Sequence, residues 1–214
     1  MVWQTAGYLA GLGIRKAAVN AADKAKFRQA MSPAGACVLQ PSLDIDRFIT
    51  DGYFFRLGVP WGWRDLYPRE AAQAVAEVGL PVVAGVAADR ADDAWTGVLV
   101  SPIQLEGQGL TELMMNMDEF QQLRFSKLPN GRPLGLPVKV LIDGELGLLL
   151  HYAHDESGAV RGQPSAPFVA VSSTELYFAR YGQGFRAEFR ADSRDHQRYL
   201  PCLWTMFGSW RWLR

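Results

Sequence analysis

The strongest pattern in the chain is the alternation of apolar and polar positions, and it predicts a sheet. The sequence FRAEFR at residues 185–190 alternates three apolar side chains strictly with three charged ones. A two-residue period of this kind is typical of a strand with one apolar and one charged face. Apolar runs at residues 81–88, 95–103 and 168–181 predict three further strands.

The densest β-forming segment runs from Val138 to Tyr152, VKVLIDGELGLLLHY, and contains its own turn. Asp143-Gly144 separates two apolar runs in it. This dipeptide tolerates the positive φ angles of the type I′ turn that joins two antiparallel strands. Asp51-Gly52 separates Phe48-Ile49 from residues 53–55 in the same way. We therefore expect two Asp-Gly hairpins in the sheet.

Three segments favour helix. Residues 67–79 are the clearest, because Pro68 suits the first position of a helix and Gly79 suits its end. Residues 1–31 are rich in alanine, and residues 110–123 also have a composition that favours helix. We expect these helices to pack on the sheet.

Together these elements predict a single α+β domain over residues 1–214. It is a mainly antiparallel sheet built from Asp-Gly hairpins, with about three helices packed against it. The best candidate for an internal boundary is the proline-rich loop at residues 128–137. A chain of 214 residues is long enough to bury a substantial core without disulfides or metals.

Composition and charge add limits on the class of protein. Hydrophobic residues make up 49% of the chain and charged residues 21%, the balance of an ordinary folded protein. No segment approaches the roughly 20 apolar residues that span a bilayer. Cys37 and Cys202 are too few for a disulfide framework, and the sequence leaves one long-range bridge between them open. We expect a soluble, cytoplasmic protein that makes no contact with a membrane.

His151, His154 and Asp155 are the residues that bring metal-type ligands closest together in the sequence. On a continuous strand, residues three apart point to opposite faces, so both histidines would bind one ion only if the strand ended between them. His196 could join them from a distance. A solvated hairpin end is the favoured interpretation of these residues. A metal-dependent hydrolase at His151 and His154 is therefore our third hypothesis for the function.

Motifs for covalent or nucleotide chemistry are missing from the sequence. It has no Gly-x-Ser-x-Gly elbow, and neither cysteine has a histidine nearby in the sequence. Gly182-x-Gly184 and Gly11-x-Gly13 lack the third glycine or the Lys-Ser/Thr pair of a phosphate-binding loop. We therefore assign no catalytic residue, expect no cofactor, and favour a protein that is not an enzyme.

Aromatic and arginine residues carry the remaining functional signal. Trp61, Trp63, Trp210 and Trp212 are candidates for an interface with another protein, since tryptophan and arginine dominate such interfaces. The C-terminal third also combines arginine for phosphate with flat rings for bases, which is the chemistry of RNA or single-stranded DNA recognition. The residues of this nucleic-acid face would be Tyr177, Arg180, Tyr181, Arg186, Arg190, Arg194 and Arg198.

Our sequence-based hypothesis is a non-catalytic binding or assembly protein that acts on another protein, whose identity the sequence does not give. The alternative is a nucleic-acid-contacting subunit of a larger complex. It ranks second because Glu188, Asp192 and Asp195 interrupt the basic face, and because a net charge of zero is unusual for a nucleic-acid binder.

Overall fold

The protein has an α+β fold, seen here in a computed structural model. The structure describes residues 21–52, 54–88, 96–104, 110–157, 165 and 167–213. Within these residues it contains a nine-stranded sheet, a three-stranded sheet and five helices. The expected N-terminal helix lies outside the described residues up to Asn20, and so does the acidic segment at residues 89–93.

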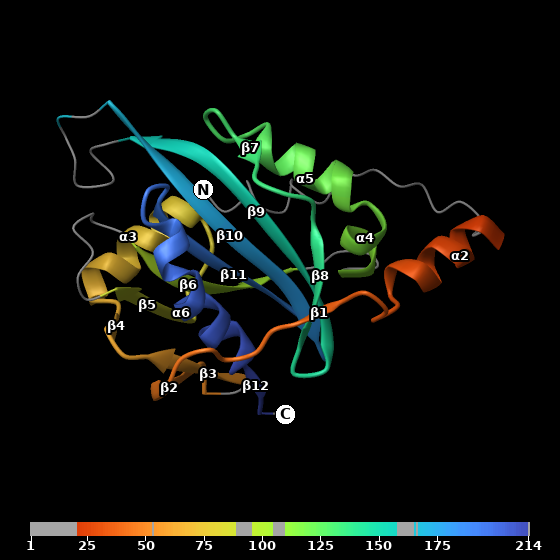
Figure 1. The fold of residues 1–214 in the computed structure, drawn as a ribbon, viewed down its shortest axis with the longest axis horizontal. Helices are drawn as coiled ribbons and strands as arrows, with labels where there is room; N and C mark the ends of the chain where they lie inside the picture. Colours follow the sequence, from red (N-terminus) through yellow and green to blue (C-terminus); the bar gives the residue numbers. More distant parts are fainter. Residues whose placement is uncertain are drawn as a thin grey trace.

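The large sheet is mainly antiparallel. Its strands are β1 Cys37–Val38, β4 Trp63–Asp65, β5 Ala84–Ala88, β6 Gly97–Ile103, β7 Arg132–Pro133, β8 Val138–Ile142, β9 Glu145–Ser157, β10 Phe168–Arg180 and β11 Gln183–Asp192. Their order is β1-β8-β9-β10-β11-β6-β5-β4, and β7 pairs with β9 off this path (Figure 1). Each described pairing is antiparallel except that of β1 with β8. The large sheet therefore contains strands that precede the loop at residues 128–137 in the sequence and strands that follow it.

Asp143 and Gly144 connect β8 to β9, with φ angles of 47° and 86°. Ile142 and Glu145 are directly paired across this turn. Two consecutive positive φ angles are those of a type I′ turn, which matches the twist of the strands it joins. The connection between β2 and β3, which contains Asp51, is longer and is stabilised differently. The carboxylate of Asp51 accepts hydrogen bonds from the backbone N–H groups of Phe54 at 2.8 Å and Phe55 at 3.1 Å.

The small sheet and the helices complete the fold. The small sheet has the order β12-β3-β2, with β2 Ile45–Thr50, β3 Phe55–Pro60 and β12 Arg211–Trp212. The helices are α2 Ala21–Ala30, α3 Pro68–Val78, α4 Leu110–Met115, α5 Met117–Phe125 and α6 His196–Gly208. None of the described helices is long and apolar enough to cross a membrane.

The five described helices outnumber the roughly three that the sequence predicts. The helix expected at residues 67–79 is α3, which spans Pro68–Val78 and is capped by Gly79 with a φ of 68°. The expected helix at residues 110–123 is divided into α4 and α5. The helix α6 was not expected, because Pro201 lies inside it and proline ordinarily interrupts a helix.

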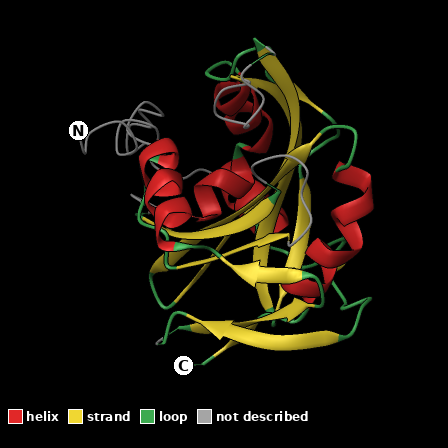
Figure 2. Cartoon of the chain, turned by 90° about the vertical axis from the view of Figure 1, so that its left-hand side faces the viewer, coloured by secondary structure: helices red, strands yellow, loops and turns green. Residues whose placement is uncertain are grey.

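The two faces of the large sheet carry separate cores. On the first face, α6 and the small sheet enclose the larger core, which includes Phe55, Phe178 and Trp210. On the opposite face, α4 and α5 pack against β9 and β10 through residues such as Leu113 and Phe120. We call these the α6 face and the α5 face, and Figure 2 shows helices on both sides of the sheet.

The end of α6 lies tightly against the segment that links β1 to β2. A Cβ atom at Gly208 would lie 2.6 Å from the backbone carbonyl carbon of Gln40 and 2.7 Å from the backbone nitrogen of Pro41. Backbone atoms cannot move aside as a flexible side chain can. We therefore expect Gly208→Ala to lower the free energy of unfolding by about 1–3 kcal/mol, although alanine favours helix.

Urea denaturation measures this effect, and Gly135→Ala is the matched control. A Cβ atom at Gly135 would have nothing within 4 Å, so this variant should keep the stability of the wild type. Equal stability of the two variants would contradict the tight contact at Gly208.

Candidate functional site

A row of charged side chains crosses the α5 face of the three longest strands. Because side chains alternate along a strand, Arg186, Glu188 and Arg190 of β11 point to the same face. They meet one glutamate from each of β9 and β10, and an arginine from α5. We call these residues the buried ion network, and they are Arg124, Glu156, Glu175, Arg186, Glu188 and Arg190.

Glu175 lies at the centre of the buried ion network and is 0% exposed. Its carboxylate accepts hydrogen bonds from the guanidinium groups of Arg124, at 2.8 Å, and Arg186. The hydroxyl groups of Tyr152 and Tyr177 also donate to it, each at 2.7 Å. Burial raises the pKa of this carboxyl, but the two arginines outweigh burial and hold the pKa far below its usual range. Glu175 is therefore ionised at neutral pH.

The rest of the buried ion network consists of similar pairs of glutamate and arginine. Glu188 accepts hydrogen bonds from Arg186 and Arg190, and Glu156 accepts one from Arg190 at 3.3 Å. Burial raises the pKa of Glu188, yet the same two arginines lower it overall. Three carboxylates thus balance three guanidinium groups. Ion pairs that are buried among one another in this way suit a structural role.

Two histidines meet on the α6 face of the same strands. His151 Nδ1 lies 2.7 Å from the hydroxyl oxygen of Thr174, and His196 Nε2 lies 3.3 Å from that same oxygen. The two ring centroids are 4.6 Å apart. We call His151 and His196 the histidine pair. Burial lowers the pKa of both side chains, and with His151 as a second cause the pKa of His196 falls to about 4.

The structure separates the three ligands of the sequence-based metal hypothesis. The strand β9 continues through both His151 and His154, so their side chains point to opposite faces. His154 Nε2 lies 2.9 Å from Glu156, and Asp155 accepts a hydrogen bond from Asn130 at 2.7 Å. In the part of the chain that the structure describes, no group of three or more His, Cys, Asp or Glu residues could hold a metal ion.

The four tryptophans of the protein-interface hypothesis lie in different environments. Trp61 is 73% exposed, whereas Trp63 and Trp210 are buried. Trp212 is partly buried and packs against the larger core. These four rings therefore do not form one exposed surface. Trp61, at the turn between β3 and β4, is the most exposed of the four.

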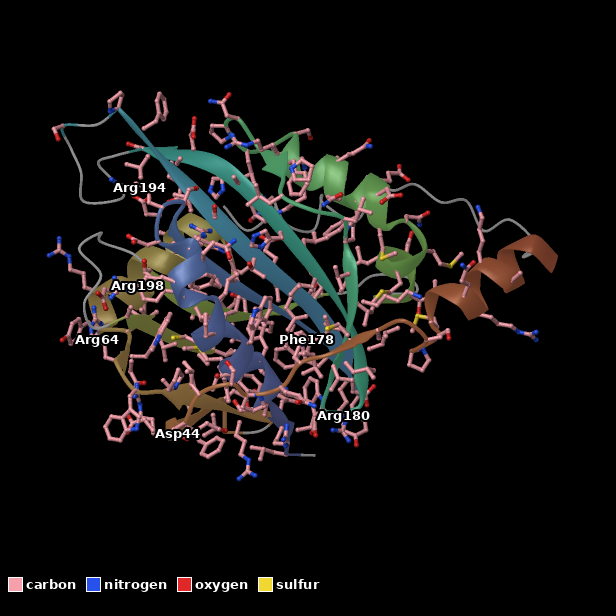
Figure 3. The ribbon with its side chains drawn as sticks, viewed as in Figure 1. Asp44, Arg64, Phe178, Arg180, Arg194 and Arg198 are labelled. Atoms are coloured by element: carbon pink, nitrogen blue, oxygen red, sulfur yellow. The ribbon has the colours of Figure 1, made fainter. Side chains whose placement is uncertain are left out.

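An open hollow of about 540 Å³ lies beside Trp61, between this turn and the first half of α6. We call it the tryptophan hollow, and its lining includes Trp61, Trp63, Ala88, Arg198, Tyr199 and Cys202. Trp63 contacts Tyr199 edge to face, with ring centroids 5.9 Å apart. Arg198 is exposed on α6 (Figure 3). Cys202 is a free thiol, as is Cys37, so the bridge that the sequence left open is not formed.

The residues of the nucleic-acid hypothesis are also dispersed. Tyr177, Arg186 and Arg190 lie within or beside the buried ion network. Arg180 and Arg194 lie toward opposite ends of the long strands (Figure 3), and Arg194 is paired with Asp192 at 2.7 Å. Tyr181 is 71% exposed, next to Arg180. The basic and aromatic residues thus divide between the interior and separate parts of the surface.

Comparisons with known proteins give structural likenesses only. No protein-family model matches the chain, and no curated protein matches it. Among solved structures, cyanobacterial PsbP (CyanoP) from Synechocystis sp. PCC 6803 is 14% identical with a TM-score of 0.48, and the match covers 85% of this chain and 99% of that one. LpqN of Mycobacterium tuberculosis, involved in cell envelope biogenesis, is 12% identical with a TM-score of 0.45, over 74% and 82% of the two chains.

A protein of unknown function from Pseudomonas aeruginosa, PA94, is 11% identical with a TM-score of 0.44, over 72% of this chain and 88% of that one. At these identities and TM-scores, the likeness carries no argument about the fold or the activity of this chain.

Proposed function

We propose that this is a non-catalytic binding protein that holds a segment of another protein at the tryptophan hollow. The observation that carries the proposal is Trp61, which is 73% exposed at the edge of the hollow. A large aromatic ring in water is a source of binding free energy, because a partner that covers it removes apolar surface from solvent. Tryptophan is accordingly enriched among the residues that dominate protein interfaces.

The chemistry of the hollow suggests what the partner segment contains. The rings of Trp61, Trp63 and Tyr199 offer apolar surface, and Arg198 adds a positive charge beside them. An extended peptide with an aromatic or aliphatic anchor next to an acidic residue would match both features.

Selection from a random peptide library displayed on phage tests this proposal. We expect the wild-type protein to enrich peptides that combine an apolar anchor with an acidic residue. Trp61→Ala should weaken the binding of the selected peptides by about thirtyfold, the effect of losing about 2 kcal/mol at an interface hot spot. Urea denaturation of this variant should match the wild type, since the ring is exposed.

Tyr181→Ala is the matched control, because Tyr181 is a ring of similar exposure, 71%, outside the hollow. This variant should bind the selected peptides as the wild type does. The absence of enrichment, or equal loss of binding in both variants, would overturn the proposal. Binding of single-stranded RNA with an affinity that falls steeply as salt rises would favour the nucleic-acid alternative instead.

A further inference from the structure

The histidine pair includes the first residue of α6, the helix that forms one wall of the tryptophan hollow. His196 is the first residue of α6 and is only 2% exposed. Arg198 and Tyr199, which line the hollow, follow it within the first turn of the same helix. The position of this wall therefore depends on how the first turn of α6 is held against the sheet.

Thr174 links the two histidines through a single hydroxyl group. Its one proton can be donated to one imidazole nitrogen, while its oxygen accepts a hydrogen bond from the N–H group of the other ring. This arrangement needs an unprotonated nitrogen on at least one histidine. If both rings are protonated, both nitrogens are donors, and two positive charges lie with their ring centroids 4.6 Å apart.

The surroundings offer little compensation for such charges. On β10, the neighbouring Ser172 hydroxyl is paired with Ser193 at 2.9 Å. On β11, the ring of Phe189 lies 5.1 Å from that of His196. The charged groups at the end of β11 and in the turn before α6 are Asp192, Arg194 and Asp195. Asp192 and Arg194 are paired at 2.7 Å, and the side chain of Asp195 makes no helix-cap hydrogen bond.

We infer that the histidine pair is a pH-sensitive latch: acidification releases the first turn of α6 from the sheet and disassembles the tryptophan hollow. The loosening of α6 stands on the geometry of the pair alone. The consequence for a bound partner, which is release in mildly acidic solution, rests on the proposed binding function.

The pH range of the latch follows from the sign of the shifts. The folded state lowers the pKa of both histidines below their ordinary value of 6.5. Their contribution to stability is therefore complete above pH 6.5 and is lost as the pH falls toward about 4, the pKa of His196. The pKa of Glu175 is also lowered, but its contribution declines only below its ordinary value of 4.5. Between pH 6.5 and 4.5 the loss is thus due to the histidine pair.

Hydrogen exchange of the full chain at pH 7 and pH 5, corrected for intrinsic exchange rates, tests the latch. For the wild type, we expect the amide groups of residues 198–200, 202 and 203 to lose protection by roughly ten- to thirtyfold at pH 5, as proton linkage at His196 implies. The central strands β9 and β10 should stay protected. His196→Gln cannot be protonated at residue 196 in this range and leaves His151 as the one titrating ring of the pair, so it should show a smaller loss than the wild type.

Two further variants keep the test decisive if His196→Gln does not fold. His151→Gln removes one of the two charges and should reduce the loss of protection, whereas His154→Gln, on the opposite face, should retain the full loss. Unchanged protection of α6 in the wild type at pH 5 would overturn the latch. So would an equal loss in His151→Gln and the wild type.

Peptide binding supplies the second measurement. A peptide selected at pH 7 should bind the wild type at least tenfold more weakly at pH 5, while His196→Gln or His151→Gln should show a smaller change. Loosening of α6 with unchanged peptide affinity would overturn the link between latch and hollow. Failure to select any peptide at pH 7 would overturn the proposed function, and the exchange measurement would still decide the latch.

Discussion

Glu175→Gln is expected to lower the free energy of unfolding by about 3–5 kcal/mol, because it removes one partner of a buried ion pair. Glutamine has nearly the same shape as glutamate but no charge. Arg124 and Arg186 would then stay buried without the negative charge that they share in the native protein. Urea denaturation at pH 7 measures the loss.

Glu119→Gln is the matched control for this variant. Glu119 is exposed on α5, the same helix that carries Arg124, and its replacement should change stability by less than about 1 kcal/mol. A similarly small change in Glu175→Gln would contradict the role we assign to the buried ion network.

The pH dependence gives a second test of Glu175. A carboxyl group whose pKa is lowered on folding stabilises the native state above its ordinary pKa and loses that contribution as the pH falls below it. The contribution of Glu175 should therefore decline below pH 4.5 in the wild type. In Glu175→Gln this part of the acid-induced loss should be missing.

Phe178→Ala is expected to lower the free energy of unfolding by a similar amount, about 3–5 kcal/mol, the usual cost of deleting a buried aromatic ring. Phe178 is 0% exposed. Its ring centroid lies 4.7 Å from that of Trp210 and 5.7 Å from that of Trp212. The deletion leaves a cavity among rings that are too rigid to fill it. Chemical denaturation followed by tryptophan fluorescence measures both the stability and the disturbance of these rings.

Phe168→Ala on the same strand controls for the loss of a phenylalanine from β10. Phe168 is 63% exposed, so its replacement should change stability by only about 0.5 kcal/mol. If the two variants were equally stable, the core on the α6 face would be far less tightly packed than the ring contacts of Phe178 indicate.

Local patterns predicted much of the sheet. The expected strands at residues 95–103, 168–181 and 185–190 correspond to β6, β10 and β11. They could be predicted because a two-residue period with a buried face can be recognised in a few consecutive residues. The division of residues 110–123 into α4 and α5 and the presence of α6 were not predicted. In α6 the apolar residues Leu203, Met206 and Phe207 have helical spacing, but Pro201 obscured the pattern.

The candidate site was harder to predict, since its parts come from distant positions. The alternation in β11 placed Arg186, Glu188 and Arg190 on one face, but the same pattern fits a solvated surface. Burial of this face depends on α5 and on Glu175 of the neighbouring strand, which only the strand register brings together. The histidine pair depends in the same way on contact between β9 and α6. The sequence alone allowed His196 to join His151 but did not require it.

The small sheet has a consequence for how the chain folds during synthesis. Its strand β3 pairs with β12, with Phe55 opposite Trp212, so residues near the start of the described chain need residues near its end. Until residues 211 and 212 have emerged from the ribosome, β3, with Phe55, Leu57 and Val59, lacks this partner strand. Such long-range contacts form slowly and leave nascent apolar surface open to aggregation. We expect newly made chains to be a target for chaperones until β12 has emerged and paired with β3.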